Sequence, residues 1–359
     1  MTSMAGDGRP LGRHALRSPV LVLAVLLVAL ALVAAVASTV GAAGIPLSRL
    51  PAALGLVQGN PATVSRDQLV LWSIRLPRIA LAIMVGALLA AGGTIMQGLF
   101  RNPLADPMLA GISPGAGFAS ATAIVIGDRL MAESNRVLPF ELLPPAAIAG
   151  ALVTTILLYR LATRYGRTSI ATLLLAGIAI GALANAGIGF LVFLADDRQL
   201  RDITFWLLGS LGGATWSKVF AIAPFAALLA AGLPFIARGL DLIVLGEAEA
   251  FHMGIAVERL KRIAIVLVAA ATGAAVSVAG VIGFVGIVVP HLLRLVIGPG
   301  HRLLLPAALC LGAILLLVAD TFARIIAAPA ELPIGIVTAA IGAPFFLSLL
   351  LRQRAAVGS

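Results

Sequence analysis

Ten apolar runs constrain this chain more than any other feature of its sequence. A helix crosses about 30 Å of hydrocarbon with about 20 apolar residues, and inside hydrocarbon every backbone polar group needs a partner within the segment or its neighbours. We therefore expect an all-α membrane protein with ten transmembrane helices per subunit. The runs occupy approximately residues 19–41, 77–100, 108–127, 140–161, 169–195, 216–237, 262–283, 284–297, 302–326 and 332–351.

The amino-acid composition also indicates a membrane protein. Apolar residues make up 61% of the chain and charged residues 11%, less than half of the share, about 25%, that is usual in soluble domains. A net charge of +10 is also found in nucleic-acid-binding proteins. In so apolar a chain it indicates basic loops beside anionic lipid, so we expect the lipid bilayer, and no nucleic acid, as a partner.

The N-terminal segment imitates a secretory signal, because Arg9, Arg13 and Arg17 precede an apolar run. That run is long enough to span a bilayer, so we predict an uncleaved first helix with a cytoplasmic N-terminus. Ten spans then make both termini cytoplasmic. The predicted domains are a cytoplasmic tail at residues 1–18, one ten-helix domain at 19–351 and a cytoplasmic tail at 352–359.

This topology places Arg75 and Arg78 outside, where basic residues are the exception. The stretch "RLPRIALAI" that begins at Arg75 returns as "RLKRIAIVL" from Arg259. The two stretches open the second and seventh helices, an odd number of crossings apart, so a true repeat would be inverted. The alternative is a chance match in a biased composition.

Several kinds of chemistry are absent from the sequence. It contains no Gly-x-x-x-x-Gly-Lys-Ser/Thr loop for ATP and no His-Glu-x-x-His or Cys-x-x-Cys motif for a metal. We expect no catalytic residues, no metal site and no permanently bound cofactor. Carboxylates such as Asp106, Asp320 and Glu331 lie near helix ends, whereas proton-coupled carriers keep such groups at mid-membrane. The energy is therefore expected from another subunit, with an ion-coupled secondary transporter as the alternative.

At this point the sequence resembles the FecCD-type permeases, which are membrane subunits of bacterial ABC importers for cobalamin, iron-siderophores and haem. Matching segments span nearly the whole chain after the first helix. They include "RLPRIALAIMVGALLAAGGTIMQGLFRNPLADPMLAGISPGAG" (75–117), "GVIGFVGIVVPHLLRLVIGPGHR" (280–302) and "ELPIGIVTAAIGAPFF" (331–346).

The resemblance implies a transport subunit rather than an enzyme, in the bacterial cytoplasmic (inner) membrane. Its implied partners are a second copy of itself, with the pathway at the homodimer interface, and two cytoplasmic ABC ATPase subunits, which alone bind ATP. A periplasmic substrate-binding protein completes the assembly.

Two partner sites follow from the resemblance. Arg75, Arg78 and Arg324 match arginines that take acidic knobs of the binding protein; the alternative is that they snorkel to the lipid interface. The second is a segment at 239–261 that sits on the ATPase. Its residues 247–253 are expected to form a short helix stopped by a glycine, with a second helix from 256; the alternative is an ordinary basic loop. The implied ATPase contacts are Gly246, Glu247, Ala250, Met253 and Gly254.

Two further sites concern the cargo. A cytoplasmic gate is implied at Thr168, Ser169, Ile170 and Ala171, against the alternative of a plain basic turn.

The outer loop at 195–213 contains "QLRDITFW", which is more similar to haem permeases of the family. Arg198 and Arg201 would meet the haem propionates at the entrance, unless neighbouring aspartates already pair with them. The expected cargo is haem, with ferric siderophore or cobalamin as alternatives. No histidine or tyrosine is predicted outside, so no axial ligand for haem iron is evident.

Overall fold

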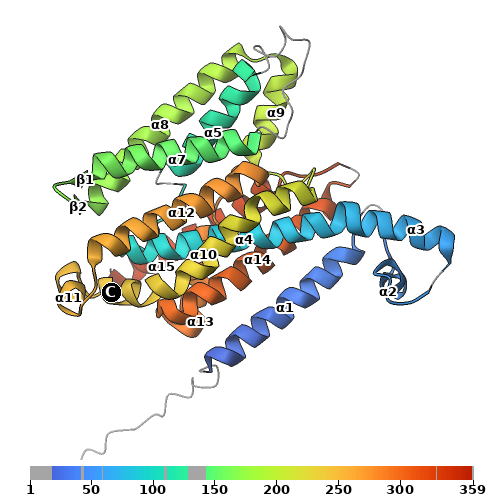
Figure 1. Ribbon diagram of the computed structural model, residues 1–359, viewed down its shortest axis with the longest axis horizontal. Helices are drawn as coiled ribbons and strands as arrows, with labels where there is room; N and C mark the ends of the chain where they lie inside the picture. Colours follow the sequence, from blue (N-terminus) through green and yellow to red (C-terminus); the bar gives the residue numbers. More distant parts are fainter. Residues whose placement is uncertain are drawn as a thin grey trace, which may run out of the picture.

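A computed structural model describes residues 18–41, 44–58, 60–108, 111–127, 143–328 and 330–357. Within these residues the chain is almost entirely helical (Figure 1). The long elements are α1 (Pro19–Thr39), α4 (Leu76–Phe100), α7 (Leu143–Ala162), α8 (Ile170–Leu194), α10 (Trp216–Ile243), α12 (Val257–Ala279), α14 (His301–Ile326) and α15 (Ile334–Val357). The shorter helices are η1 (Leu47–Arg49), α2 (Leu50–Ala53), α3 (Pro61–Leu69), η2 (Val70–Arg75), α5 (Ile112–Thr122), η3 (Ala123–Gly127), α9 (Asp197–Leu208), α11 (Glu247–His252) and α13 (Val285–Ile297).

The ten predicted spans all have helical counterparts. Among the described residues, seven helices are long and apolar enough to cross a bilayer. Three shorter apolar helices, Ile112–Gly127, Val285–Ile297 and Ile334–Ser348, account for the other predicted runs. The all-α, ten-span prediction is therefore confirmed. The predicted N-terminal tail lies outside the described residues, apart from Ser18.

The second span is longer than its apolar run. α3, η2 and α4 form one continuous helix. Its part from Thr63 to Phe100 is a single candidate membrane span. Its middle, η2, is a π-helix in which the Leu76 N–H bonds to the Leu71 carbonyl, five residues back. Pro77 follows at once and has no N–H to give to the preceding turn. Prolines and π-bulges are the usual causes of irregular helix geometry, and here the two coincide.

α4 and α12 lie at the centre of the bundle, and glycines let their neighbours approach. A Cβ built on Gly86 would lie 2.3 Å from the carbonyl oxygen of Gly312 in α14. A Cβ on Gly93 would lie 2.1 Å from the carbonyl oxygen of Gly286 in α13. Helices in lipid associate by such close packing, because lipid supplies no hydrophobic drive between them. The small-residue run "GALLAAGG" is thus the seam along which α4 meets α13 and α14.

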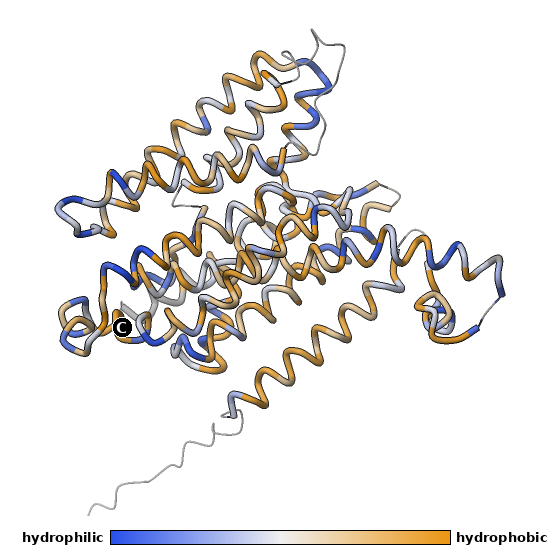
Figure 2. Tube along the Cα trace, in the orientation of Figure 1, coloured by the Kyte–Doolittle hydropathy of each residue, from blue (hydrophilic) through white to orange (hydrophobic). Residues whose placement is uncertain are grey.

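The two ends of the bundle differ. α11, the C-terminal end of α15 and a hairpin of β1 (Thr163–Arg164) and β2 (Arg167–Thr168) lie at one end, and α3 and α9 lie at the other (Figure 1). Hydrophilic residues gather at both ends, while the length of the bundle is hydrophobic (Figure 2). We call these the α11 end and the α9 end.

The hairpin was not predicted from the sequence. Tyr165 and Gly166 connect its strands with positive φ angles of 51° and 74°, the pattern of a type I′ turn. Two residues per strand are too few for a pattern of alternating side chains to be recognised.

The glycine seam makes a testable prediction. Gly86→Ala places a methyl group against the Gly312 backbone, which cannot give way as a side chain could. We expect a loss of about 1–3 kcal/mol of stability, as for other overpacked sites. Thermal unfolding of the purified chain in detergent measures it. Gly189→Ala in α8, where a Cβ meets nothing within 4 Å, is the matched control and should be neutral. Equal stability of both variants would contradict the seam.

Candidate functional site

A buried cluster of charges at the α9 end is built around Arg78. Its side chain lies inside the bundle at the start of α4, where the residue is 8% exposed. Nη2 lies 2.9 Å from Asp320 Oδ1, and Nε donates to the same carboxylate at 3.0 Å. Nη1 donates to Glu331 Oε1 at 2.6 Å. Arg78 therefore joins the end of α14 to the loop before α15.

Two more arginines complete this cluster and reach α1. Arg324 Nε lies 3.1 Å from Asp320 Oδ2, so the two side chains form an ion pair. The Nε–H of Arg324 makes no hydrogen bond in this arrangement. Arg324 also donates to the Val40 carbonyl at 3.2 Å, and Arg75 donates to the Ser38 carbonyl. The carbonyls at a helix C-terminus lack partners within the helix, so these two cations suit the end of α1.

The structure changes where the predicted docking arginines lie. Both interpretations of the sequence put Arg75 and Arg78 at a surface, either the docking face or the lipid interface. The structure instead buries them at 4% and 8% exposure, because carboxylates and carbonyls of other helices hold them. Docking by these arginines stays a prediction. The exposed member of the cluster is Glu331, whose side chain is 49% exposed.

Asp320 and Glu331 are functional candidates to which sequence reasoning gave no role. Asp320 is 242 residues from Arg78 in sequence, so no local pattern links them. A usable signal was present in the chain. Carboxylates are rare here, and Asp320 precedes Arg324 by four residues, which places the two on one helix face. An acid and a base on one face of an apolar helix indicate a buried pair.

The predicted ATPase segment has the expected local structure. α11 covers Glu247–His252 and α12 begins at Val257, which confirms the prediction of two helices to within a residue. Gly254, with φ of 84°, ends the first, as expected. Residues 239–243 belong to α10, however, so the irregular part of the predicted segment is shorter. Binding to an ATPase stays a prediction.

α11 presents an exposed apolar edge. Phe251 is 67% and Met253 is 44% exposed, whereas Ala250 is fully buried against the bundle. Gly246 opens the helix with φ of 136°, a conformation that side chains rarely adopt. Exposed aromatic and methionine side chains on a short helix outside the spans are typical of a protein contact.

The predicted gate residues lie where the hairpin joins α8. Thr168 ends β2 and is buried, and its Oγ1 lies 3.0 Å from that of Thr163. Ser169 is the N-cap of α8 and accepts a hydrogen bond from the Thr172 N–H at 3.3 Å. Ile170 and Ala171 form the first turn of α8, and Ala171 is exposed. The four residues are brought together at the α11 end; gating stays a prediction.

The predicted entrance arginines lie on α9. Arg198 and Arg201 are both exposed at the opposite end from α11. Asp196 forms a capping box with Gln199 at the start of α9. Entry of an anionic cargo along this helix stays a prediction, as does pairing with the neighbouring aspartates.

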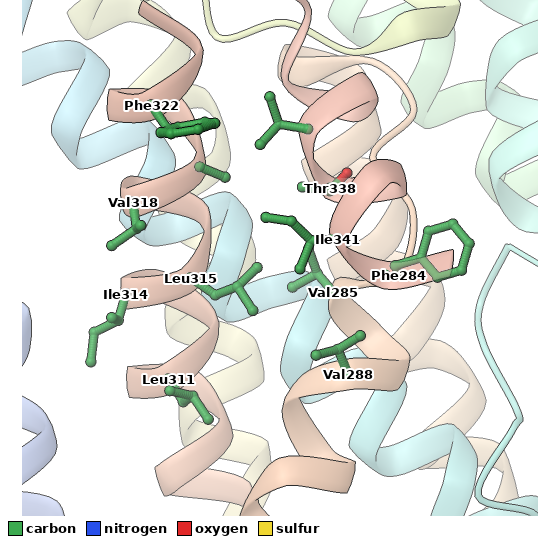
Figure 3. Close-up of a pocket in the computed structure, with 13 residues that line it drawn as sticks. Phe284, Val285, Val288, Leu311, Ile314, Leu315, Val318, Phe322, Thr338 and Ile341 are labelled. Atoms are coloured by element: carbon green, nitrogen blue, oxygen red, sulfur yellow. The ribbon is translucent and has the colours of Figure 1, made fainter. Parts of the chain in front are cut away.

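Among the cavities in the described part of the chain, two differ sharply in their lining. One, of about 410 Å³, lies between α13, α14 and α15 (Figure 3). Its walls are apolar, apart from Thr338, whose hydroxyl donates to its own helix. It offers nothing to orient a polar ligand. The other, of about 200 Å³, lies at the α9 end beside Asp202, Trp206 and Lys218.

Asn185 is a polar residue within α8 that sequence reasoning missed. It is exposed on the side of α8 that contacts no other described helix, together with small residues such as Ala182 and Ala186. An amide facing lipid has no hydrogen-bond partner and is costly there. Its exposure favours a polar neighbour at this point of α8, although large apolar side chains such as Ile178 and Phe193 are exposed on the same helix.

One buried carboxylate lies in the loop between α4 and α5. Asp106 Oδ1 accepts a hydrogen bond from the Met108 N–H at 2.8 Å. Burial raises the pKa of Asp106 to about 6, and this hydrogen bond opposes the rise. Within the described residues, no group of three or more His, Cys, Asp or Glu side chains is placed to hold a metal ion.

The sequence matches a known transport family over most of its length. The pattern of the FecCD transport family covers residues 24–352. The hemin transport system permease protein HmuU of Yersinia pestis is 47% identical over 291 residues, which are 79% of this chain and 83% of that protein. The cobalamin import system permease protein BtuC of Halobacterium salinarum is 44% identical over 296 residues, 82% of this chain and 76% of that protein.

Solved structures share the fold. A protein described as a metal-chelate type ABC transporter, in an inward-facing conformation, matches with a TM-score of 0.79 at 31% identity, over 92% of this chain and 99% of that one. PsaBC from Streptococcus pneumoniae matches with a TM-score of 0.56 at 19% identity, over 80% of this chain and 94% of that one. The match to PsaBC, at 19% identity, shows similarity of fold only.

The charge cluster at the α9 end predicts a large effect of one substitution. Asp320→Asn leaves the buried Arg78 and the partly buried Arg324 without their shared anion, which should cost about 3–5 kcal/mol. Thermal unfolding of the purified chain measures this. Asp197→Asn removes a carboxylate from exposed α9 and should cost less than about 1 kcal/mol. If the two variants were equally stable, Asp320 would not be holding the cluster together.

Proposed function

Because the chain belongs to the FecCD transport family, we propose that it is the membrane-spanning permease of an ATP-driven importer that moves haem from a periplasmic binding protein into the cytoplasm. The observation that carries the proposal is 47% identity to a hemin transport permease over 79% of the chain. The permease itself makes and breaks no covalent bond. Two ATPase subunits supply the energy.

α8 supports a pathway at a homodimer interface. Its exposed side carries Asn185 among small and large apolar residues, and it faces away from the rest of the bundle. A second copy packed on this side would enclose a route lined by the Asn185 amide together with apolar side chains such as Ile178 and Phe193. Such a route suits a large flat cargo that should bind weakly on its way through.

α11 supports an ATPase partner. The exposed Phe251 and Met253 supply an apolar contact of the kind that fits a groove in a soluble subunit. With α11 on the cytoplasmic side, α9 faces the periplasm, which is the orientation proposed from the basic N-terminal tail. The chain then lies in the bacterial inner membrane as a multi-pass subunit with both termini inside.

Cobalamin is the second candidate cargo. The BtuC proteins of Halobacterium salinarum and Klebsiella pneumoniae are 44% and 42% identical to this chain, close to the value for the hemin permease. Arg198 and Arg201 on α9 favour haem, because the two propionates of haem are natural partners for paired arginines. Cobalamin offers no such carboxylates.

Reconstitution tests the cargo. The permease, its ATPase and its binding protein are placed in liposomes, and uptake of haem, a ferric siderophore and cobalamin is measured with and without ATP. We expect ATP-dependent uptake of haem alone. Uptake of cobalamin or siderophore instead would move the cargo to the second candidate. Uptake by the permease without ATPase, driven by a proton or sodium gradient, would overturn the whole proposal.

Glu331 governs how a binding protein reaches the buried arginines. It is half exposed, yet it holds Arg78 at 2.6 Å from the solvent side. A carboxylate on the binding protein can pair with Arg78 only by taking the place of Glu331. Displacement of Glu331 frees the Nη1 of Arg78 for the incoming acid. Glu331 therefore acts as an internal competitor of docking.

This competition predicts that removing a charge strengthens docking. Glu331→Gln should lower the Kd for the binding protein by about tenfold, since about 1.4 kcal/mol of competition is relieved. Surface plasmon resonance on the permease in nanodiscs measures it, with a larger effect at low salt. Asp197→Asn removes one carboxylate from the same end and controls for net charge. Unchanged or weaker docking of Glu331→Gln would contradict the competition.

A further inference from the structure

Lys261 lies in the first turns of α12 with its ammonium group buried at the α11 end of the bundle. The residue is 2% exposed, although it is one of the longest side chains in the protein. Nζ donates to Glu247 Oε2 at 2.7 Å, to Glu258 Oε1 at 3.1 Å and to the Thr168 carbonyl at 3.0 Å. An ammonium has three N–H donors, so each has one acceptor.

The three acceptors come from three different elements. Glu247 is the first residue of α11, Glu258 lies on α12 and Thr168 ends β2. A single side chain thus connects the helix proposed to contact the ATPase with the hairpin that precedes α8. The neighbouring Ser169 is the N-cap of α8, so the connection ends within one residue of a membrane-spanning helix.

A second bond fixes the hairpin to the same point. The Thr168 N–H donates to Glu258 Oε2 at 3.0 Å, while its carbonyl accepts from Lys261. Both backbone polar groups of Thr168 are therefore held by side chains of α12. Bonds that involve a charged group are shorter and stronger than neutral ones, so the hairpin cannot slide freely against α12.

Packing alone does not require a lysine here. A buried ammonium costs free energy that an apolar side chain of similar length would not cost. The neighbouring basic residues of this helix, Arg259 and Arg262, are exposed, whereas Lys261 points inward. Its position is explained by the bonds it makes and not by a need to fill space.

We propose that Lys261 is the positioning residue that couples α11 to α8. When the ATPase displaces α11, the Glu247–Lys261–Thr168 connection carries the displacement to the hairpin and so to the start of α8. The proposal rests on the importer function proposed above, because it needs a partner that moves α11. Lys261 is too deeply buried to touch that partner, so its effect is transmitted within the chain.

The experiment uses the complete importer in liposomes. Lys261→Met keeps an unbranched side chain of similar length but removes the ammonium. Glu247→Gln removes the negative charge of the α11 acceptor and so weakens the bond to α11 alone. Arg238→Met, which takes away an exposed cation of α10 at the same end, is the matched control. The readouts are cargo taken up per ATP hydrolysed, ATP hydrolysis itself and recovery of the ATPase with the permease.

We expect Lys261→Met to hydrolyse ATP but to move about fivefold less cargo per ATP, or worse, as loss of coupling between two sites predicts. Glu247→Gln should lower the same ratio. The double variant should be no worse than the stronger single variant, because both break one connection. Arg238→Met should match the wild type.

Three outcomes would overturn the proposal. The first is an unchanged ratio in Lys261→Met. The second, which decides the matter if Lys261→Met fails to assemble, is an unchanged ratio in Glu247→Gln. The third is an additive loss in the double variant, which would mean that Glu247 acts only on the ATPase. Failure of the wild-type complex to take up any cargo with ATP would instead count against the proposed function.

Discussion

Hydrocarbon cannot solvate a charge, and the organisation of this protein follows from that constraint. Each buried ionic group must find its counterpart within the protein, on its own helix or on another, because lipid offers none. At the α9 end Arg78 and Asp320 join α4 to α14, and Glu331 extends the connection toward α15. At the α11 end Lys261 does the same for α11, α12 and the hairpin. Between the two ends the helices are held by close contact of glycines and apolar side chains.

The sequence predicted those parts of the structure that depend on local properties. Hydropathy located ten spans because the length of an apolar run and the thickness of a bilayer are tied together. The break between α11 and α12 was predicted because Gly254 is suited to the left-handed conformation that ends a helix. The continuous helix through η2 was missed, since its first turns are polar and only the apolar part was counted.

The candidate sites could be predicted only in part, because their partners are distant in sequence. Arg75 and Arg78 were identified as exceptions to the charge pattern, but hydropathy says nothing about which carboxylate meets which arginine. Thr168 was identified as a gate residue from resemblance, while Lys261, 93 residues away, was not. Pairings of this kind arise from how helices pack. A single sequence records the residues but not their contacts.

The π-helix η2 has a consequence for the orientation of α3. A π-helical turn contains more residues than an α-helical turn, so side chains before it are rotated about the axis relative to those after it. Before the π-helix, Asp67 of α3 lies 3.4 Å from Arg49, and after it, Arg78 of α4 faces the core. One extra residue rotates the side chains before the π-helix by about 100° relative to those after it, compared with an uninterrupted α-helix. The extra residue in the π-helical turn therefore sets the direction in which the side chains of α3 point.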